Sequence, residues 1–98
     1  MHLERLGGEG ALLRVAGELD ISSLPALDAA LHRFERWAIP SLLVDAEDVG
    51  FIDLSAIGWL VRANARLASA GGSLLVVHPP ECLLRILDVV DVDLPVLQ

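Results

Sequence analysis

The sequence predicts an α/β fold: a single domain with an N-terminal β-hairpin, then alternating helices and strands that form a mixed, largely parallel sheet with helices packed on it. The 98 residues, 54% of them hydrophobic, suffice for one core, so residues 1–98 are expected to form one domain. Short apolar runs alternate with stretches whose apolar residues recur at helical spacing. Glycine, proline and serine separate these runs where turns and helix ends are expected.

A hairpin is predicted at the N-terminus. Residues 2–6 alternate weakly between apolar and polar, and residues 12–15 are mainly apolar. Between them, residues 7–10 read Gly-Gly-Glu-Gly, which is typical of a turn. The Gly-Glu-Leu-Asp segment of residues 17–20 is expected to end the second strand.

A first helix is predicted after this hairpin. Ser22, Ser23 and Pro25 are residue types favoured at a helix cap and in a first turn. Four apolar residues at helical spacing are expected to face the core: Leu24, Leu27, Leu31 and Phe34. Residues 38–40 end this helix, and Trp37 is expected to pack at its terminus.

The centre of the chain is predicted to be a buried strand followed by an amphipathic helix. Residues 42–44 form the apolar strand run. The helix is expected to bury one stripe of residues: Ile57, Leu60, Val61, Ala65 and Ala68. Between the two elements only Asp53 and Ser55 have capping-type side chains, and either one can accept a hydrogen bond from the first helical turn.

The C-terminal part is predicted to add two strands and a helix. Residues 71–72 are glycines that close the central helix, and residues 74–77 form another buried strand. Residues 79–80, both proline, open a last helix whose apolar face consists of Leu83, Ile86, Leu87 and Val90. Residues 94–97 are expected to form a short final strand. Strands that alternate with helices in this order favour parallel pairing.

Charge and composition exclude several functional classes. Fourteen acidic against seven basic residues give a net charge of −7, and no Lys/Arg cluster offsets it, so binding to nucleic acid is not expected. The apolar runs are far shorter than the roughly 18 residues of a membrane helix, so no direct membrane insertion is expected. The single cysteine, Cys82, and the lack of a recognisable signal segment favour the cytoplasm.

The sequence shows no pattern typical of a catalytic, cofactor or metal site. Gly8 and Gly10 lack the third glycine and the helix start of a dinucleotide-binding motif. Ser55 lacks the flanking glycines of a hydrolase nucleophile. Three histidines have no metal-ligand spacing and are expected to be structural or surface residues: His2, His32 and His78. We therefore expect no enzyme, no cofactor and no metal ion.

Four short motifs follow one another along the chain. They are Gly17-Glu18-Leu19-Asp20 before a Ser/Pro-capped helix, Leu43-Val44-Asp45, Phe51-Ile52-Asp53-x-Ser55-x-Ile57-Gly58, and Gly71-Gly72 before an apolar strand. In this order and spacing they resemble the STAS domain, and more narrowly the bacterial anti-sigma-factor antagonists. The resemblance runs from the hairpin to the last helix, and the Asp-x-Ser segment is its most specific part.

The resemblance implies a switch between partners. In such proteins the serine that matches Ser55 is phosphorylated by an anti-sigma factor that is also a serine kinase. The unphosphorylated form binds this kinase, so that the sigma factor is released, and a phosphatase that acts on the phosphorylated serine resets the switch. A phosphate adds about −1.5 to −2 charges at neutral pH, and a helix N-terminus tolerates them. Modification is therefore expected to weaken partner binding and to leave the local fold intact.

The motif around Ser55 departs from the family pattern at two positions. The usual Asp-Ser-Ser-Gly reads Asp53-Leu54-Ser55-Ala56 here. Leu54 removes the neighbouring hydroxyl, so Ser55 is the single candidate phosphoacceptor in the motif. Ala56 makes the backbone after the acceptor stiffer than glycine would.

A partner-binding surface is expected around Ser55. Ser55, Trp59, Arg62 and Arg66 recur at i, i+4, i+7 and i+11, so they are expected on the exposed face of the central helix. An exposed tryptophan beside arginines is typical of a binding hot spot. In the alternative interpretation, Trp59 folds over a neighbouring loop and the arginines are merely solvated.

The resemblance brings a second loop to this surface. It places Asp20 and Ser22 near the Ser55 turn, where they either cap the first helix or extend the docking surface. The expected partner-binding residues are Asp20, Ser22, Asp53, Ser55, Trp59, Arg62 and Arg66.

The function expected from the resemblance is that of an anti-sigma-factor antagonist, a non-enzymatic module that binds an anti-sigma factor kinase and is switched off by phosphorylation of Ser55. Two alternatives stay open. One is a STAS subunit that docks on a transporter ATPase or a signalling scaffold without phosphorylation. The other is ligand binding or hydrolysis at the Ser55 turn.

Overall fold

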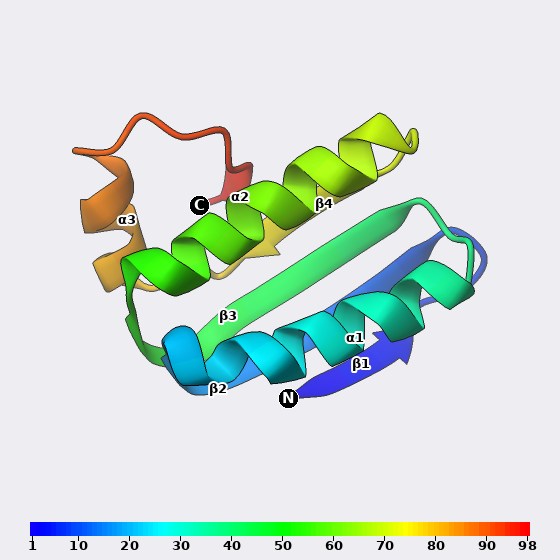
Figure 1. Ribbon diagram of the computed structural model, residues 1–98, viewed down its shortest axis with the longest axis horizontal. Helices are drawn as coiled ribbons and strands as arrows, with labels where there is room; N and C mark the ends of the chain where they lie inside the picture. Colours follow the sequence, from blue (N-terminus) through cyan, green and yellow to red (C-terminus); the bar gives the residue numbers. More distant parts are fainter.

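The computed structural model describes residues 1–98 as a five-stranded sheet with helices packed on it (Figure 1). The strands are β1 (His2–Arg5), β2 (Gly10–Leu19), β3 (Ser41–Ile52), β4 (Ser73–Val77) and β5 (Val96–Leu97). The helices are the 3-10 turn η1 (Ile21–Ser23) and the α-helices α1 (Leu24–Arg36), α2 (Leu54–Ser69) and α3 (Glu81–Leu87). The predicted α/β class and the order of its elements are confirmed.

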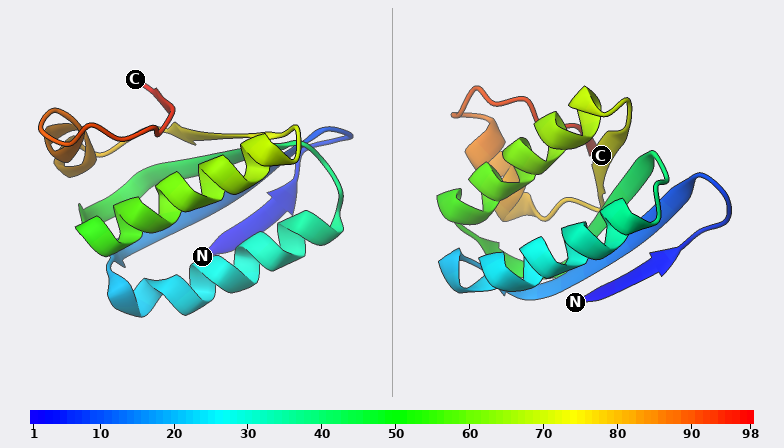
Figure 2. Two further views of the ribbon diagram at one scale, coloured as in Figure 1. Left: turned by 45° about the horizontal axis from the view of Figure 1, so that its top comes forward. Right: turned by 45° about the vertical axis from the view of Figure 1, so that its right-hand side comes forward.

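The sheet has the strand order β1-β2-β3-β4-β5. β1 pairs antiparallel with β2, and every later pair is parallel, so the predicted mixed, largely parallel sheet is confirmed. Because successive parallel strands are neighbours, right-handed crossovers place α1 and α2 on the same face. The two helices indeed lie side by side over one face of the sheet, while α3 lies at the end where α2 begins (Figures 1 and 2).

The hydrophobic core lies between this sheet face and the two helices. Alternate residues of the strands point into it, such as Leu42, Val44 and Ala46 of β3. Three of the four residues predicted for the buried face of α1 are buried, and Leu24 is half-buried. No helix is both long enough and apolar enough to cross a membrane.

Two strands are longer than predicted. The prediction that residues 17–20 end β2 is wrong, because β2 continues to Leu19, which is buried. Gly17 adopts a φ of +78°, and the register between β2 and β3 shifts on both sides of it. The glycine therefore absorbs an irregularity within the strand, as is common for glycine in strands. β3 likewise continues beyond the apolar run of residues 42–44, to Ile52.

The buried face of α2 differs from the predicted stripe. Ile57 and Leu60 are buried and Val61 is half-buried, but Ala65 and Ala68 are exposed. Residues expected elsewhere complete the buried face: Ala56, Trp59, Ala63, Asn64 and Leu67. The buried face is rotated about the helix axis relative to the predicted stripe, because α2 packs against α1 as well as against the sheet.

The C-terminal elements are present in the predicted order, but two of them are shorter than predicted. α3 ends at Leu87, so Val90 lies beyond it, and β5 covers only Val96–Leu97 of the predicted strand 94–97. Leu83 is buried, and Trp37 and Cys82 are half-buried against the core. Gly71 closes α2 with a φ of +83°, as its place after a helix predicts.

Gly72 is required for a different reason, and we expect Gly72→Ala to lower the free energy of unfolding by about 1–3 kcal/mol. A Cβ on Gly72 would lie 2.3 Å from the carbonyl oxygen of Pro40, so the backbone would have to move. Urea unfolding measures the loss. The control is Gly8→Ala, because a Cβ there meets no atom within 4 Å. Equal stability of the two variants would contradict the close packing of Gly72 against the Pro40 carbonyl.

Candidate functional site

Ser55 lies in the first turn of α2, directly after β3. Asp53 is the N-cap of this helix, and its Oδ1 accepts the backbone N–H of Ala56 at 3.0 Å. Of the two capping candidates, Asp53 therefore holds the cap. Ser55 is half-buried, and its hydroxyl has no hydrogen-bond partner within the chain. Its side chain is thus free of any structural role in the cap.

The loop after β2 is fixed beside this turn. The backbone N–H of Asp53 donates to the carbonyl of Leu19 at 3.0 Å, which ties the start of α2 to the end of β2. Asp20 caps η1, because its Oδ1 accepts the backbone N–H of Ser22 at 3.0 Å and also accepts the Ser22 hydroxyl. Ser23 Oγ in turn accepts the backbone N–H of Asp20 at 3.2 Å. Capping by Asp20 is confirmed, although the capped element is η1, which leads into α1.

The carboxylate of Asp20 carries a stable negative charge. The hydrogen bond from the Ser22 hydroxyl, with those from the backbone N–H groups of Ser22 and Ser23, lowers the pKa of Asp20 below its ordinary value. Asp20 is therefore a fixed anion in the loop beside the Ser55 turn at neutral pH.

The predicted exposure of Trp59 is wrong. The side chain is 5% exposed, and its Nε1–H donates to Asp28 Oδ1 of α1 at 2.7 Å. Because the buried face of α2 extends toward α1, the residue one turn after Ser55 points into the contact between the helices. Trp59 thus supports the surface from beneath and does not form its exposed centre.

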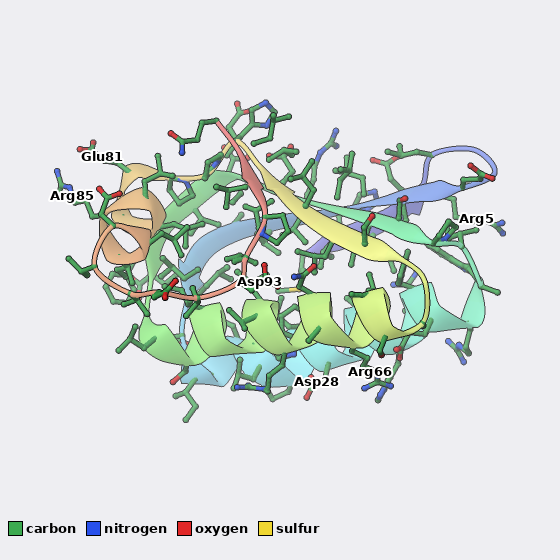
Figure 3. The ribbon with its side chains drawn as sticks, turned by 90° about the horizontal axis from the view of Figure 1, so that it is seen from above. Arg5, Asp28, Arg66, Glu81, Arg85 and Asp93 are labelled. Carbon is green, nitrogen blue, oxygen red and sulfur yellow. The ribbon has the colours of Figure 1, made fainter.

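The two arginines of the predicted surface are exposed, as expected, but they lie apart. Arg66 forms an ion pair with Glu35 of α1, with 2.7 Å between Nε and Oε2, and it lies three turns along α2 from Ser55. Figure 3 shows Arg66 and Asp28 on the helix side of the molecule. Arg62 is nearer to the Ser55 turn and makes no ion pair. The structure therefore brings Asp20, Ser22, Asp53 and Ser55 together and places Arg66 elsewhere.

The sequence did not reveal that exposed apolar side chains lie at the same end of the sheet as Ser55. Ile21 is 70% exposed, Leu54 is 66% exposed and Phe51 is 49% exposed. All three lie where β2 and β3 end and α2 begins, and we call them the apolar edge. The signal that could have identified it is the position of Leu54 and Ile21 next to capping residues, where side chains point away from the core.

No concave site forms at Ser55. A hollow of about 330 Å³ lies between α1 and α2, with Asp28, Trp59 and Arg62 in its wall. Another, of about 380 Å³, lies at the far end of α2 beside Pro40 and Gly72. Ser55 is in the wall of neither, and no observation favours ligand binding or hydrolysis at this turn.

One cluster on the sheet was not foreseen. Asp45, Glu47 and His78 place their nitrogen and oxygen atoms within 4.8 Å of one another, which is a spacing that metal sites share. His78 Nδ1 lies 3.0 Å from Asp45 Oδ1 and 3.6 Å from Glu47 Oε2, and we assign these contacts as an ion-pair network. His2, His32 and His78 are all exposed, as predicted for surface residues.

This network predicts a pH-dependent stability. The hydrogen bond that the His78 ring donates to the Asp45 carboxylate raises the pKa of His78. The backbone N–H of Glu47, followed by His78, lowers the pKa of Asp45. The pair therefore stabilises the fold between the unfolded-state pKa values of about 4 and about 6.5. Its contribution is lost as the pH rises through the pKa of folded His78, and also as it falls through that of Asp45.

We expect His78→Gln to lower the thermal midpoint most at about pH 5–6 and progressively less at alkaline pH. Midpoints measured from pH 4 to 9 test this, with His32→Gln as control, because His32 is exposed and makes no ion pair. A loss of stability that is the same at every pH would show that the ion pair does not form.

The sequence matches the family model described as "Mlab, STAS domain" over residues 2–98. The chain belongs to the STAS domain family. No curated protein matches this STAS domain. Among solved structures, it is similar to the anti-sigma factor antagonist SpoIIAA in its unphosphorylated form, with a TM-score of 0.78 and 18% sequence identity. That match covers 99% of this chain and 86% of SpoIIAA.

A second similar structure is the phosphorylated form of SpoIIAA, described as a Bacillus cell fate determinant. Its TM-score is 0.74 at 20% identity, and the match covers 89% of this chain and 79% of that one. At these identities the likeness establishes the fold that the STAS domain shares with SpoIIAA.

Proposed function

We propose that this STAS domain is an anti-sigma-factor antagonist that works in the cytoplasm without enzymatic activity of its own. Its unphosphorylated form binds an anti-sigma factor serine kinase through the edge around Ser55. The kinase phosphorylates Ser55 and thereby ends the complex, and a phosphatase removes the phosphate. The observation that carries this proposal is the free hydroxyl of Ser55 in a helix turn whose cap is held by another residue, Asp53.

Asp53 caps α2 and Ser55 does not, so phosphorylation of Ser55 is compatible with the folded structure. If Ser55 held the cap, a phosphate on its oxygen would remove a hydrogen bond worth about 1 kcal/mol from the start of α2. Here the capping bond comes from Asp53 Oδ1, so the modified serine breaks no internal contact. The positive end of α2 also tolerates the added negative charge.

The apolar edge explains why such a phosphate would end a complex. Ile21, Phe51 and Leu54 offer side chains that a partner can bury, and Ser55 lies next to Leu54. A partner that covers these side chains also removes water from Ser55. A phosphate there would be an anion that the partner strips of water, and its desolvation at the interface costs several kcal/mol.

The proposed partner surface comprises Asp20, Ser22, Asp53, Ser55 and Arg62, together with the apolar edge. Trp59 contributes by holding α2 against α1 through Asp28. Arg66, which was also expected on this surface, is held by Glu35 and is a peripheral member at most.

The intact mass of the protein after incubation with the candidate kinase and ATP tests this function. The kinase is first isolated by pull-down with the wild-type domain. We expect one added phosphate on the wild type and none on Ser55→Ala. Ser69→Ala is the matched control, because Ser69 is an exposed serine at the opposite end of α2, and this variant should still gain one phosphate. Equal phosphorylation of the wild type and Ser55→Ala would contradict the proposal.

A second candidate function is a STAS subunit that docks on a transporter ATPase or a scaffold without phosphorylation. The apolar edge favours it, because an apolar contact needs no phosphate, and Leu54 enlarges that contact where the family pattern has a serine. Ser55→Asp distinguishes the two functions. Co-purification of an ATPase that survives this substitution unchanged would support the docking subunit.

A further inference from the structure

Arg62 is a cation near Ser55 without an anionic partner. Four other arginines are engaged: Arg66 with Glu35, Arg14 with Glu4 and Asp45, Arg85 with Glu81, and Arg5 over the Trp37 ring. Arg62 forms no ion pair within 4.0 Å, although its side chain is exposed on the helix face that leads to Ser55. An unpaired guanidinium beside a phosphoacceptor is available for a new anion.

The Arg62 side chain folds back toward the start of α2. A Cβ built on Gly58 would lie 3.1 Å from Arg62 Nη1 and 4.0 Å from its Cζ. The guanidinium therefore lies against the bare backbone of Gly58, one turn nearer the helix N-terminus than its own Cα. A side chain at position 58 would occupy this space.

Gly58 in turn is the neighbour of Ser55 on the helix surface. Residues three apart in a helix have Cβ atoms about 5–6 Å from each other. Nη1 lies 3.1 Å from the Gly58 Cβ position, so it is at most about 9 Å from Ser55 Cβ. The phosphate oxygens of a modified Ser55 lie three bonds beyond Cβ, and the flexible Arg62 side chain can close the remaining distance to them.

We propose that Arg62 is the counter-ion of phosphorylated Ser55, and that Gly58 leaves the space through which its guanidinium reaches the phosphate. The proposal rests on the proposed function, because it concerns the phosphorylated form. Arginine suits this role, since its planar fork can donate two parallel hydrogen bonds to a phosphate.

The surrounding carboxylates make such a counter-ion necessary. Asp20 of the loop before η1 and Asp53 at the cap flank the turn, and Asp28 of α1 lines the hollow that Arg62 also lines. These groups repel a phosphate dianion, whereas Arg62 and the N-terminal end of α2 attract it. Phosphorylation would then change the partner surface in two ways. It adds an anion, and it also engages Arg62, the arginine of this surface that has no ion pair.

The test uses protein that carries phosphoserine at position 55, introduced during translation, so that no kinase is needed. The second pKa of the phosphate is measured by phosphorus NMR. We expect Arg62→Gln to raise this pKa by about 0.5 or more, a roughly threefold change in proton affinity, because an adjacent cation favours the dianion. Gly58→Val, which blocks the path of the side chain, should raise it in the same direction.

Arg66→Gln is the control, because Arg66 is also exposed but is paired with Glu35. It should leave the phosphate pKa unchanged, and circular dichroism confirms that each variant is folded. An unchanged pKa in Arg62→Gln, or an equal shift in Arg66→Gln, would overturn the role of Arg62. Neither result bears on whether a kinase modifies Ser55, which the mass measurement on the unmodified protein decides separately.

Discussion

Trp59→Ala is expected to lower the free energy of unfolding by about 3–5 kcal/mol, which is the largest stability effect that we expect from any single substitution near the site. The indole is 5% exposed between α1 and α2, so its removal leaves a cavity between the helices. It also removes the hydrogen bond from Nε1–H to Asp28. For a domain whose total stability is of the order of 5–15 kcal/mol, such a loss is a large fraction of the total.

Urea unfolding of Trp59→Ala, Trp59→Phe and Leu54→Ala separates the contributions. Trp59→Phe keeps an aromatic ring in the contact and should cost less, about 1–3 kcal/mol. Leu54→Ala removes an apolar side chain that is 66% exposed, so it should change stability by no more than about 0.5 kcal/mol. A Trp59→Ala variant as stable as Leu54→Ala would show that the indole lies on the surface.

Leu54→Asp is expected to weaken binding to the partner kinase by about 100-fold with little change in stability. Loss of a central apolar contact costs about 2 kcal/mol or more in protein interfaces, and the added carboxylate lies next to Ser55. An aspartate in the first turn of α2 is compatible with the helix, because negative charge is favoured at a helix N-terminus. Binding is measured by titration calorimetry, and stability by urea unfolding.

Leu6→Asp is the matched control for this substitution. Leu6 is also an exposed leucine, at 49%, but it follows β1 at the opposite end of the sheet (Figure 1). It should leave the affinity for the kinase unchanged. If Leu54→Asp binds as tightly as Leu6→Asp, the apolar edge is not part of the interface.

The sequence predicts the order of the elements well because local signals define it. The glycines before β2, the proline in the first turn of α1 and the Gly71-Gly72 pair after α2 each have a local conformational effect. Strand ends are less predictable, because pairing with a neighbour decides them. β2 continues through Gly17 since β3 is beside it, and neither strand shows this in its own residues.

The face of α2 illustrates why the site was only partly predictable. Helical spacing identifies a stripe, but it does not reveal that the helix packs against two neighbours at once. The second neighbour, α1, buries Trp59 and supplies Asp28 from a position 31 residues away in the chain. The choice of Asp53 over Ser55 as the cap likewise depends on the backbone geometry at the end of β3. The ion pair between Asp45 and His78 spans 33 residues and has no local signal.

The affinity of the kinase for two forms of the wild-type domain decides whether phosphorylation of Ser55 is a switch. One form is unmodified, and the other carries phosphoserine at position 55, and both are titrated against the same kinase preparation. We expect the phosphate to weaken binding by about 100-fold or more, while the thermal midpoint stays close to that of the unmodified domain. Equal affinity of the two forms would contradict a switch at Ser55 and would favour a domain that docks regardless of phosphorylation.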